Sequence, residues 1–171
     1  MKRNKVVALC ALTAVSLLIV ALIVVFFPKE KVAKIINDNA ADAVNRDFYD
    51  SHYVSGVYYD SALSVSDDSE YPASRTFLIS SEEEYEEIFS SAADPAIDFQ
   101  SRMIVVYSFA DIYKRPLVIK KISASENSIT IVLSHKKAPA GVGDACLPYQ
   151  RYVVIELSGN NYSDISISVE D

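Results

Sequence analysis

The sequence predicts an α+β protein in which an N-terminal transmembrane helix precedes an antiparallel β-sheet or small β-sandwich with one principal helix. Three observations support this fold class. An unbroken apolar run extends from Val6 to Phe27. A helix-start pattern follows a short strand pattern near Ser81. The remainder of the chain after that point consists of short segments rich in β-branched residues, separated by turn residues.

The apolar run from Val6 to Phe27 predicts a membrane anchor. About 20 apolar residues suffice for a helix to cross roughly 30 Å of hydrocarbon. Lys2, Arg3 and Lys5 precede the run. Short basic N-termini stay in the cytoplasm, whereas a large following domain is translocated largely regardless of its charge. We therefore expect a single-pass protein of the cell membrane, with residues 1–5 in the cytoplasm and residues 28–171 outside.

Two other interpretations of the N-terminus fit the residues less well. A cleaved signal peptide has a shorter apolar stretch that is closely followed by small residues, whereas this run ends in Phe26, Phe27 and Pro28. Attachment of lipid at Cys10 would require a small residue before the cysteine, and Leu9 stands there. The pattern favours a retained anchor.

The rest of the chain is acidic. The sequence has 16 Lys and Arg against 23 Asp and Glu, and setting aside Lys2, Arg3 and Lys5 leaves 13 cations and a net charge of about −10. Nucleic acids and anionic lipid surfaces are poor partners for such a balance, because their recognition depends on neutralising phosphates. We expect no nucleic-acid partner.

Two segments are predicted to connect the anchor to the domain. Residues 28–46 have apolar residues at intervals of three and four, including Val32, Ile35 and Ile36, which predicts a juxtamembrane helical stalk. Residues 47–73 are rich in Asp, Ser and Tyr and predict an acidic linker that contains one strand at 52–59.

The domain itself is expected over residues 74–171. A strand at 75–79 is followed by Ser81 and Glu84, which have the spacing of a capping box. Tyr85, Ile88 and Phe89 then stand at i, i+3 and i+4, which predicts one apolar face of a helix. The helix is expected to end before Pro95.

Five further strands are predicted after this helix. They are the segments 102–109, 117–123, 128–135, 150–157 and 162–169. The turns at 125–127 and 159–161 are short enough for hairpins, so the strands beside each turn should pair antiparallel. Alternation from Ile165 to Val169 predicts that the last strand has one buried and one solvated face.

The segment 136–148 is irregular and holds two of the four glycines and two of the six prolines. A loop of fixed shape on a rigid sheet is suited to binding, although a crossover between sheet edges explains the same composition. As a binding loop it would present these residues: Lys137, Pro139, Gly141, Gly143, Asp144, Cys146 and Pro148.

Residues 75–158 resemble the C-terminal domain of the protease-complex-stabilising protein PrcB and its uncharacterised relatives. The resemblance lies in the Ser81 to Phe89 helix, the apolar strand 103–107, the 139–148 loop and the strand that follows it. Relatives typically have a glycine-rich turn where residues 108–113 stand here without a glycine. The family implies a secreted or membrane-attached module that supports a partner protein, without known catalytic residues.

The chemistry-bearing residues favour a binding protein over an enzyme. Cys146 and His135 could form a nucleophile–base pair, with Asp144 as the orienting group, provided that they come within hydrogen-bond reach. No metal-ligand spacing or cofactor motif accompanies them. We therefore predict an extracytoplasmic protein-interaction module that stabilises or modulates a secreted or surface protease, with a Cys146-dependent enzyme or redox-responsive domain as the alternative.

Overall fold

A computed structural model describes residues 32–58, 70–91, 94, 97–138, 145–159 and 161–170. The chain divides into two units, Met1–Lys31 and Val32–Asp171, and every described residue belongs to the second. The predicted anchor at 6–27 and the first residues of the predicted stalk therefore lie outside the described residues. Among the helices within these ranges, none is long and apolar enough to cross a membrane.

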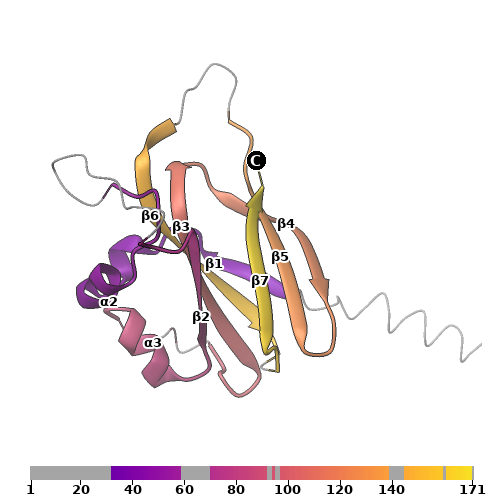
Figure 1. Ribbon diagram of the computed structural model, residues 1–171. Coiled ribbons are helices and arrows are strands. Elements are labelled where there is room, and N and C mark those ends of the chain that lie inside the picture. Colours follow the sequence, from indigo (N-terminus) through magenta and orange to yellow (C-terminus); the bar gives the residue numbers. More distant parts are fainter. Residues whose placement is uncertain are drawn as a thin grey trace, which may run out of the picture. The chain divides into compact units, whose positions relative to one another are not determined.

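Two β-sheets and short helices build the described unit (Figure 1). The elements in chain order are β1 (Ala33–Asn37), η1 (Ala41–Ala43), α2 (Arg46–Ser51), β2 (Ser74–Ile79), α3 (Glu82–Ile88), β3 (Arg102–Tyr113), β4 (Leu117–Ala124), β5 (Ser128–His135), β6 (Ala145–Ser158) and β7 (Asp164–Glu170). One sheet has the order β1-β6-β3-β2 and is antiparallel throughout. The other has the order β4-β5-β7. The predicted α+β class is confirmed, although the second sheet is mixed and two short helices, α2 and α3, stand where one principal helix was expected.

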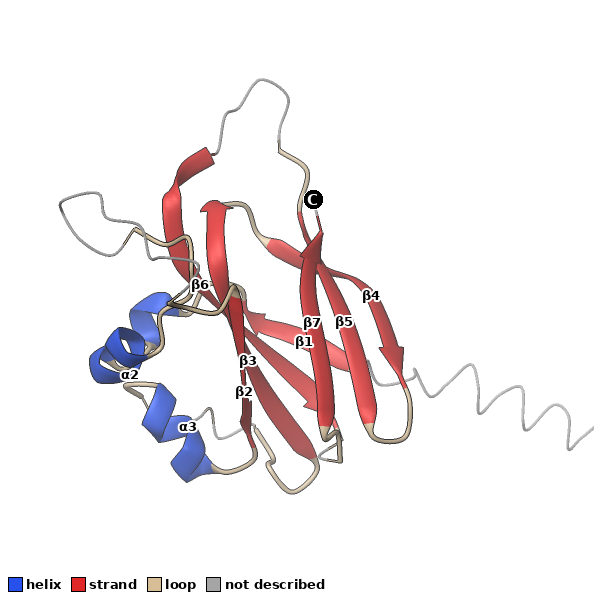
Figure 2. Cartoon of the chain, in the orientation of Figure 1, coloured by secondary structure: helices blue, strands red, loops and turns tan. Residues whose placement is uncertain are grey.

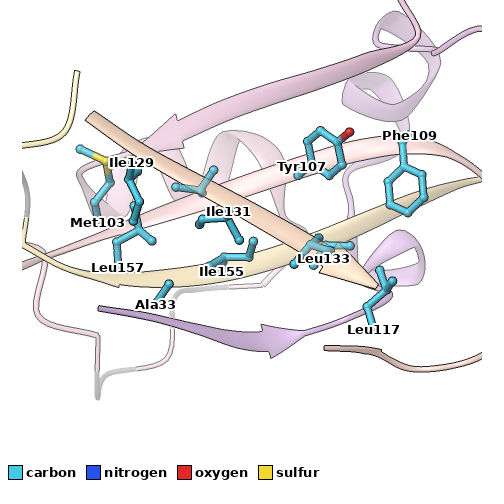
Figure 3. Packing of buried hydrophobic residues seen from close by; sticks show 12 residues of the cluster. Ala33, Met103, Tyr107, Phe109, Leu117, Ile129, Ile131, Leu133, Ile155 and Leu157 are labelled. Carbon is cyan, nitrogen blue, oxygen red and sulfur yellow. The ribbon is translucent and has the colours of Figure 1, made fainter. Parts of the chain in front are cut away.

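The larger core lies between the two sheets (Figure 3). Alternate residues of β3 and β6 point into it, because successive side chains of a strand face opposite sides. Met103, Val105, Ile155 and Leu157 are examples, and Ile131 of β5 packs against them. Each fully buried side chain of this kind stabilises the fold by about 1.5–3 kcal/mol.

The opposite face of the four-stranded sheet is covered by helices (Figure 2). Ile104 and Val106 of β3 pack there against Ile88 and Phe89. Ser81 caps α3 as predicted, because its side chain accepts a hydrogen bond from the Glu84 amide at 3.2 Å. The Glu84 carboxylate accepts from the amide of Ser80, one residue earlier than a capping box requires.

The predicted helical stalk is wrong where the structure describes it. Residues Ala33–Asn37 form strand β1, which pairs antiparallel with β6. The three-and-four spacing of apolar residues fits one turn or two of helix, but a short isolated helix is marginal in water. Pairing with β6 provides hydrogen-bond partners for the backbone groups of this segment and buries Ala33 to 3% exposure. The segment therefore forms a strand and not a helix.

The predicted linker is also part of the domain in its described part. Residues 46–51 form helix α2, and of the strand expected at 52–59 the described residues contain only a single bridge at Tyr58. Val54 and Val57 are fully buried. The amide of Val54 donates to the side-chain oxygen of Gln150, which anchors this segment to β6. The domain therefore begins near residue 32 rather than at residue 74.

The turns at the two predicted hairpins behave differently. The turn at 125–127 joins β4 and β5 antiparallel, as predicted. Strand β7, however, leaves β6 and pairs parallel with β5 in the other sheet. Both edges of β6 are already occupied by β1 and β3, so β7 has no place beside it. Gly159, with φ of +104°, redirects the chain, and the Asn127 carbonyl accepts from the amides of Ser163 and Asp164 at the start of β7.

The remaining predicted strands are confirmed with small changes in length. The last strand alternates as predicted, with Ile165, Ile167 and Val169 packed against the core and the serines exposed. Strand β6 begins at Ala145, earlier than predicted, so residues 145–148 belong to a strand and not to the irregular loop.

Candidate functional site

A buried ionic cluster closes one end of the core between the sheets. Along β3 the inward-facing positions run through Tyr107 and Phe109 to Asp111. Along β6 the same side carries Val153 and then Arg151. The side chains of Asp111 and Arg151 are each only 2% exposed, and Arg151 Nη1 lies 2.8 Å from Asp111 Oδ2. Two opposite charges thus occupy inward-facing strand positions at which apolar core residues are expected.

Arg151 joins three segments that are distant in the sequence. Its Nε donates to the Asp38 carbonyl at 2.6 Å, and its Nη2 lies 3.2 Å from Asp38 Oδ2. Its Nη1 also donates to the carbonyls of Tyr113 and Arg115. A planar guanidinium with five donors can satisfy such a set of acceptors. The cluster therefore fixes the chain after β1 and the turn after β3 onto strand β6.

His135 completes the cluster from the second sheet. Its Nε2 lies 2.9 Å from Asp111 Oδ2, and its side chain is 4% exposed. Burial alone raises the pKa of Asp111, but hydrogen bonds from His135, Arg151 and the Tyr113 amide outweigh it and hold the pKa below its ordinary value. Asp111 is therefore a carboxylate that the fold keeps ionised.

A pocket of about 730 Å³ opens beside the cluster. Its lining includes Asp38, Lys114, Pro116, Leu147, Tyr149 and Arg151. The Tyr149 hydroxyl donates to the Tyr113 carbonyl at 2.9 Å, and burial raises its pKa, so the ring stays neutral and fixed in the pocket wall. Leu147 is 61% exposed, more than any other large apolar side chain among the described residues.

A second pocket, of about 450 Å³, is lined by other residues of the ionic cluster and by their neighbours. Asp111 and His135 contribute ionisable groups to its lining, and Tyr107, Phe109 and Val169 contribute apolar surface. The ionic cluster therefore lies next to two cavities, with Arg151 lining one and the Asp111–His135 pair lining the other.

The residues predicted for the binding loop are only partly described. Lys137 is exposed, Cys146 is half-buried on β6, and the carbonyl of Pro148 accepts a hydrogen bond from the Tyr58 amide at 3.1 Å. The others lie outside the described residues: Pro139, Gly141, Gly143 and Asp144. Cys146 is thus brought to the larger pocket by a strand.

The possible Cys146–His135 pair is not assembled as a nucleophile and base in the described geometry. His135 Nε2 is directed at Asp111, and His135 lines the smaller pocket while Cys146 lines the larger one. Within the described ranges, no three His, Cys, Asp or Glu side chains come together as metal ligands.

Sequence reasoning missed Asp38, Lys114, Arg151 and Asp111. Two of these could be recognised from the strand pattern, because Arg151 and Asp111 stand on the side of their strands that faces the core. A charge at such a position indicates a buried ion pair, since an unpaired buried charge is too costly. Nothing local to Asp38 indicates its role, because its partner is more than one hundred residues away in the chain.

No family model, no curated protein and no solved structure matches this chain.

Proposed function

We propose that the chain is a membrane-anchored, extracytoplasmic protein-binding module that stabilises or modulates a secreted or surface protease. The apolar run at 6–27 supports the membrane anchor, and the cations before it support a cytoplasmic N-terminus. The sequence resemblance of residues 75–158 to the PrcB C-terminal domain supports the protease as the partner.

The observation that carries the proposal is the position of Leu147. Its side chain is 61% exposed and lies at a pocket of about 730 Å³. Ile112, which is 41% exposed on β3, lines the smaller pocket instead. A large exposed apolar side chain beside a concave surface is typical of protein interaction sites.

The strands that carry this surface are held rigidly. Arg151 ties β6 to Asp111 of β3 and to Asp38, and the Tyr149 hydroxyl binds the Tyr113 carbonyl. A preorganised surface loses less conformational entropy when it binds a partner. The buried cluster therefore serves as the support of the binding surface and not as a reaction centre.

Site-specific photo-crosslinking tests the proposal in the cells that produce the protein. A photoreactive amino acid replaces Leu147 in the full chain, and a matched variant carries it at Leu78, which is 42% exposed on β2. We expect a covalent adduct from position 147 and little from position 78. Mass spectrometry of the adduct identifies the partner, which we expect to be an extracytoplasmic protease or a subunit of its complex.

Three results would contradict the proposal. Equal adducts at both positions would mean that Leu147 marks no specific surface. A cytoplasmic protein as the partner would contradict the proposed orientation. An extracytoplasmic partner whose complex contains no protease would agree with a binding module but contradict the proposal that the partner is a protease.

A second candidate function rests on Cys146. The cysteine is half-buried and lines the same pocket as Tyr149 and Arg151, where a thiol could react with a bound molecule. Cys146→Ser separates the two functions. Unchanged crosslinking at position 147 favours the binding module, whereas loss of the cellular function with an intact fold favours the thiol chemistry.

A further inference from the structure

We propose that the pocket beside Leu147 binds a segment of the partner protein that carries an apolar side chain flanked by carboxylates. This inference rests on the proposed function and specifies the chemistry of the partner.

The end of the domain that holds the pocket is basic although the chain as a whole is acidic. Lys114 lines the pocket, and the Arg115 guanidinium lies over the Tyr113 ring, 4.4 Å from its centre. Arg115 Nη1 donates to the Lys136 carbonyl at 3.1 Å, and the Lys136 amide donates to the Pro116 carbonyl at 2.9 Å. These bonds bring Lys136 and the exposed Lys137 to the same end.

The charged side chains in the described lining of the pocket are Asp38, Lys114 and Arg151, which together carry a net charge of +1. Asp38 and Asp111 both bind Arg151, so these three side chains together carry one excess negative charge. Glu170, which pairs with Ser134 at the same end, is bound by Lys120. Against the excess negative charge stand the cations Lys114, Arg115, Lys136 and Lys137. Asp144 and Asp171 lie outside the described residues, and counting both of them still leaves a positive balance.

The chain has a net charge of −7. A basic end on an acidic protein attracts an acidic partner surface while the rest of the molecule repels it, so the charges both steer and orient the encounter.

The pocket adds a requirement for an apolar group. Leu147, Pro116 and the ring of Tyr149 give it apolar surface, and Lys114 lies in the same lining. An apolar side chain of the partner would bury surface against Leu147, while a neighbouring carboxylate would reach Lys114. Anionic lipid headgroups are a different class of partner that the same cations could attract, but they offer no side chain for a pocket of about 730 Å³.

Fluorescence polarisation with short synthetic peptides tests this inference. The full chain is placed in nanodiscs of neutral phosphatidylcholine, and the probe is a labelled peptide with one leucine between glutamates. We expect binding that weakens as salt rises from about 0.05 M to about 0.5 M, because screening shortens the reach of exposed charges. Peptides with glutamine for glutamate, or with serine for leucine, should each bind at least about fivefold more weakly.

Matched charge-reversal variants locate the effect. Lys114→Glu should weaken binding of the acidic peptide by about fivefold or more, because repulsion replaces attraction. Lys121→Glu makes the same change in net charge at an exposed residue of β4 outside the pocket lining, and it should have little effect. Circular dichroism and the thermal unfolding midpoint verify that both variants are folded.

The inference is overturned if the glutamine peptide binds as well as the glutamate peptide, or if both lysine variants weaken binding equally. The chain could instead bind phosphatidylserine vesicles and no peptide. If it sediments with these vesicles and Lys114→Glu abolishes the sedimentation, this end of the domain binds a lipid surface. A crosslinked partner whose adduct at position 147 does not depend on Lys114 would preserve the proposed function and remove this inference. Peptide binding without any crosslinked partner would support the proposed chemistry of the pocket and contradict the proposed function.

Discussion

The two ends of the layer between the sheets are built on the same strands and the same face, yet they differ in chemistry. At one end Met103 and Leu157 pair across β3 and β6 and pack with the apolar core. At the other end the same face of these strands holds Asp111 and Arg151, whose side chains are both 2% exposed. The apolar end is stabilised by burial alone, whereas the ionic end depends on every partner being present.

The difference matters for how each end responds to change. Apolar packing is non-directional, so a smaller side chain loses contacts in proportion to what is removed. Buried ions in a hydrogen-bonded network stabilise the fold only together, because one left behind is a buried unpaired charge. The ionic end should therefore be the more fragile to a single substitution and the more easily restored by a second.

The largest effect is expected from Arg151→Met. Methionine fills similar space but leaves Asp111 and three carbonyl groups without the guanidinium. We expect a loss of about 4 kcal/mol in the free energy of unfolding, as for other buried pairs from which one partner is removed. Because the chain has no tryptophan, urea unfolding is followed by circular dichroism.

A double variant provides the control for this change. Adding Asp111→Leu to Arg151→Met removes the unpaired charge, and the double variant should be more stable than Arg151→Met alone. If the two losses simply add, the ion pair does not act as a unit and the contrast between the two ends fails.

A smaller loss is expected from Ile155→Ala, four residues along the same strand and on the same face. Ile155 is fully buried in the core cluster. We expect a loss of about 3 kcal/mol in the free energy of unfolding, from lost burial and the cavity left behind. The loss should be the same at neutral and mildly acidic pH, because no charge is involved. A pH-dependent loss would show that the apolar end is coupled to the ionic one.

Acid should act selectively on the ionic end. The folded state holds the pKa of Asp111 below its unfolded value of about 3.9, despite the opposing effect of burial. The contribution of Asp111 is therefore fully present above the unfolded pKa, and it is lost as pH falls through the folded pKa.

Urea unfolding at a series of pH values measures this loss. Asp111→Asn should be less stable than the unchanged chain at neutral pH, and the difference between them should shrink below about pH 4. A difference that stayed constant down to the lowest pH would mean that the charge of Asp111 does not stabilise the fold.

The contrast between the ends also explains what the sequence could predict. Strands such as 128–135 and the helix capped by Ser81 follow from local periodicity and capping, and the structure confirms both. The core positions of β3 and β6 follow from alternation. These features depend on residues a few positions apart, so the sequence displays them directly.

The features that sequence reasoning missed depend on partners far along the chain. Residues 33–37 form a strand because β6 offers a free edge, and β7 joins the other sheet because β1 has taken that edge. The candidate pocket likewise unites Asp38, Lys114 and Leu147 from three segments. No local pattern contains such pairings: the predicted loop 136–148 includes Leu147, but neither Asp38 nor Lys114.

The smallest effect is expected where an ion pair is exposed. Lys120 Nζ lies 2.9 Å from Glu170 Oε2, a distance close to that of the Arg151–Asp111 pair, but both side chains are more than half exposed. Water solvates either charge when its partner is removed, so Lys120→Ala should change the free energy of unfolding by less than about 1 kcal/mol. Urea unfolding in low and high salt measures it, and the small difference should vanish in high salt. A loss as large as that of Arg151→Met would mean that burial is not what separates the two pairs, and the ionic end would owe its fragility to something other than its place between the sheets.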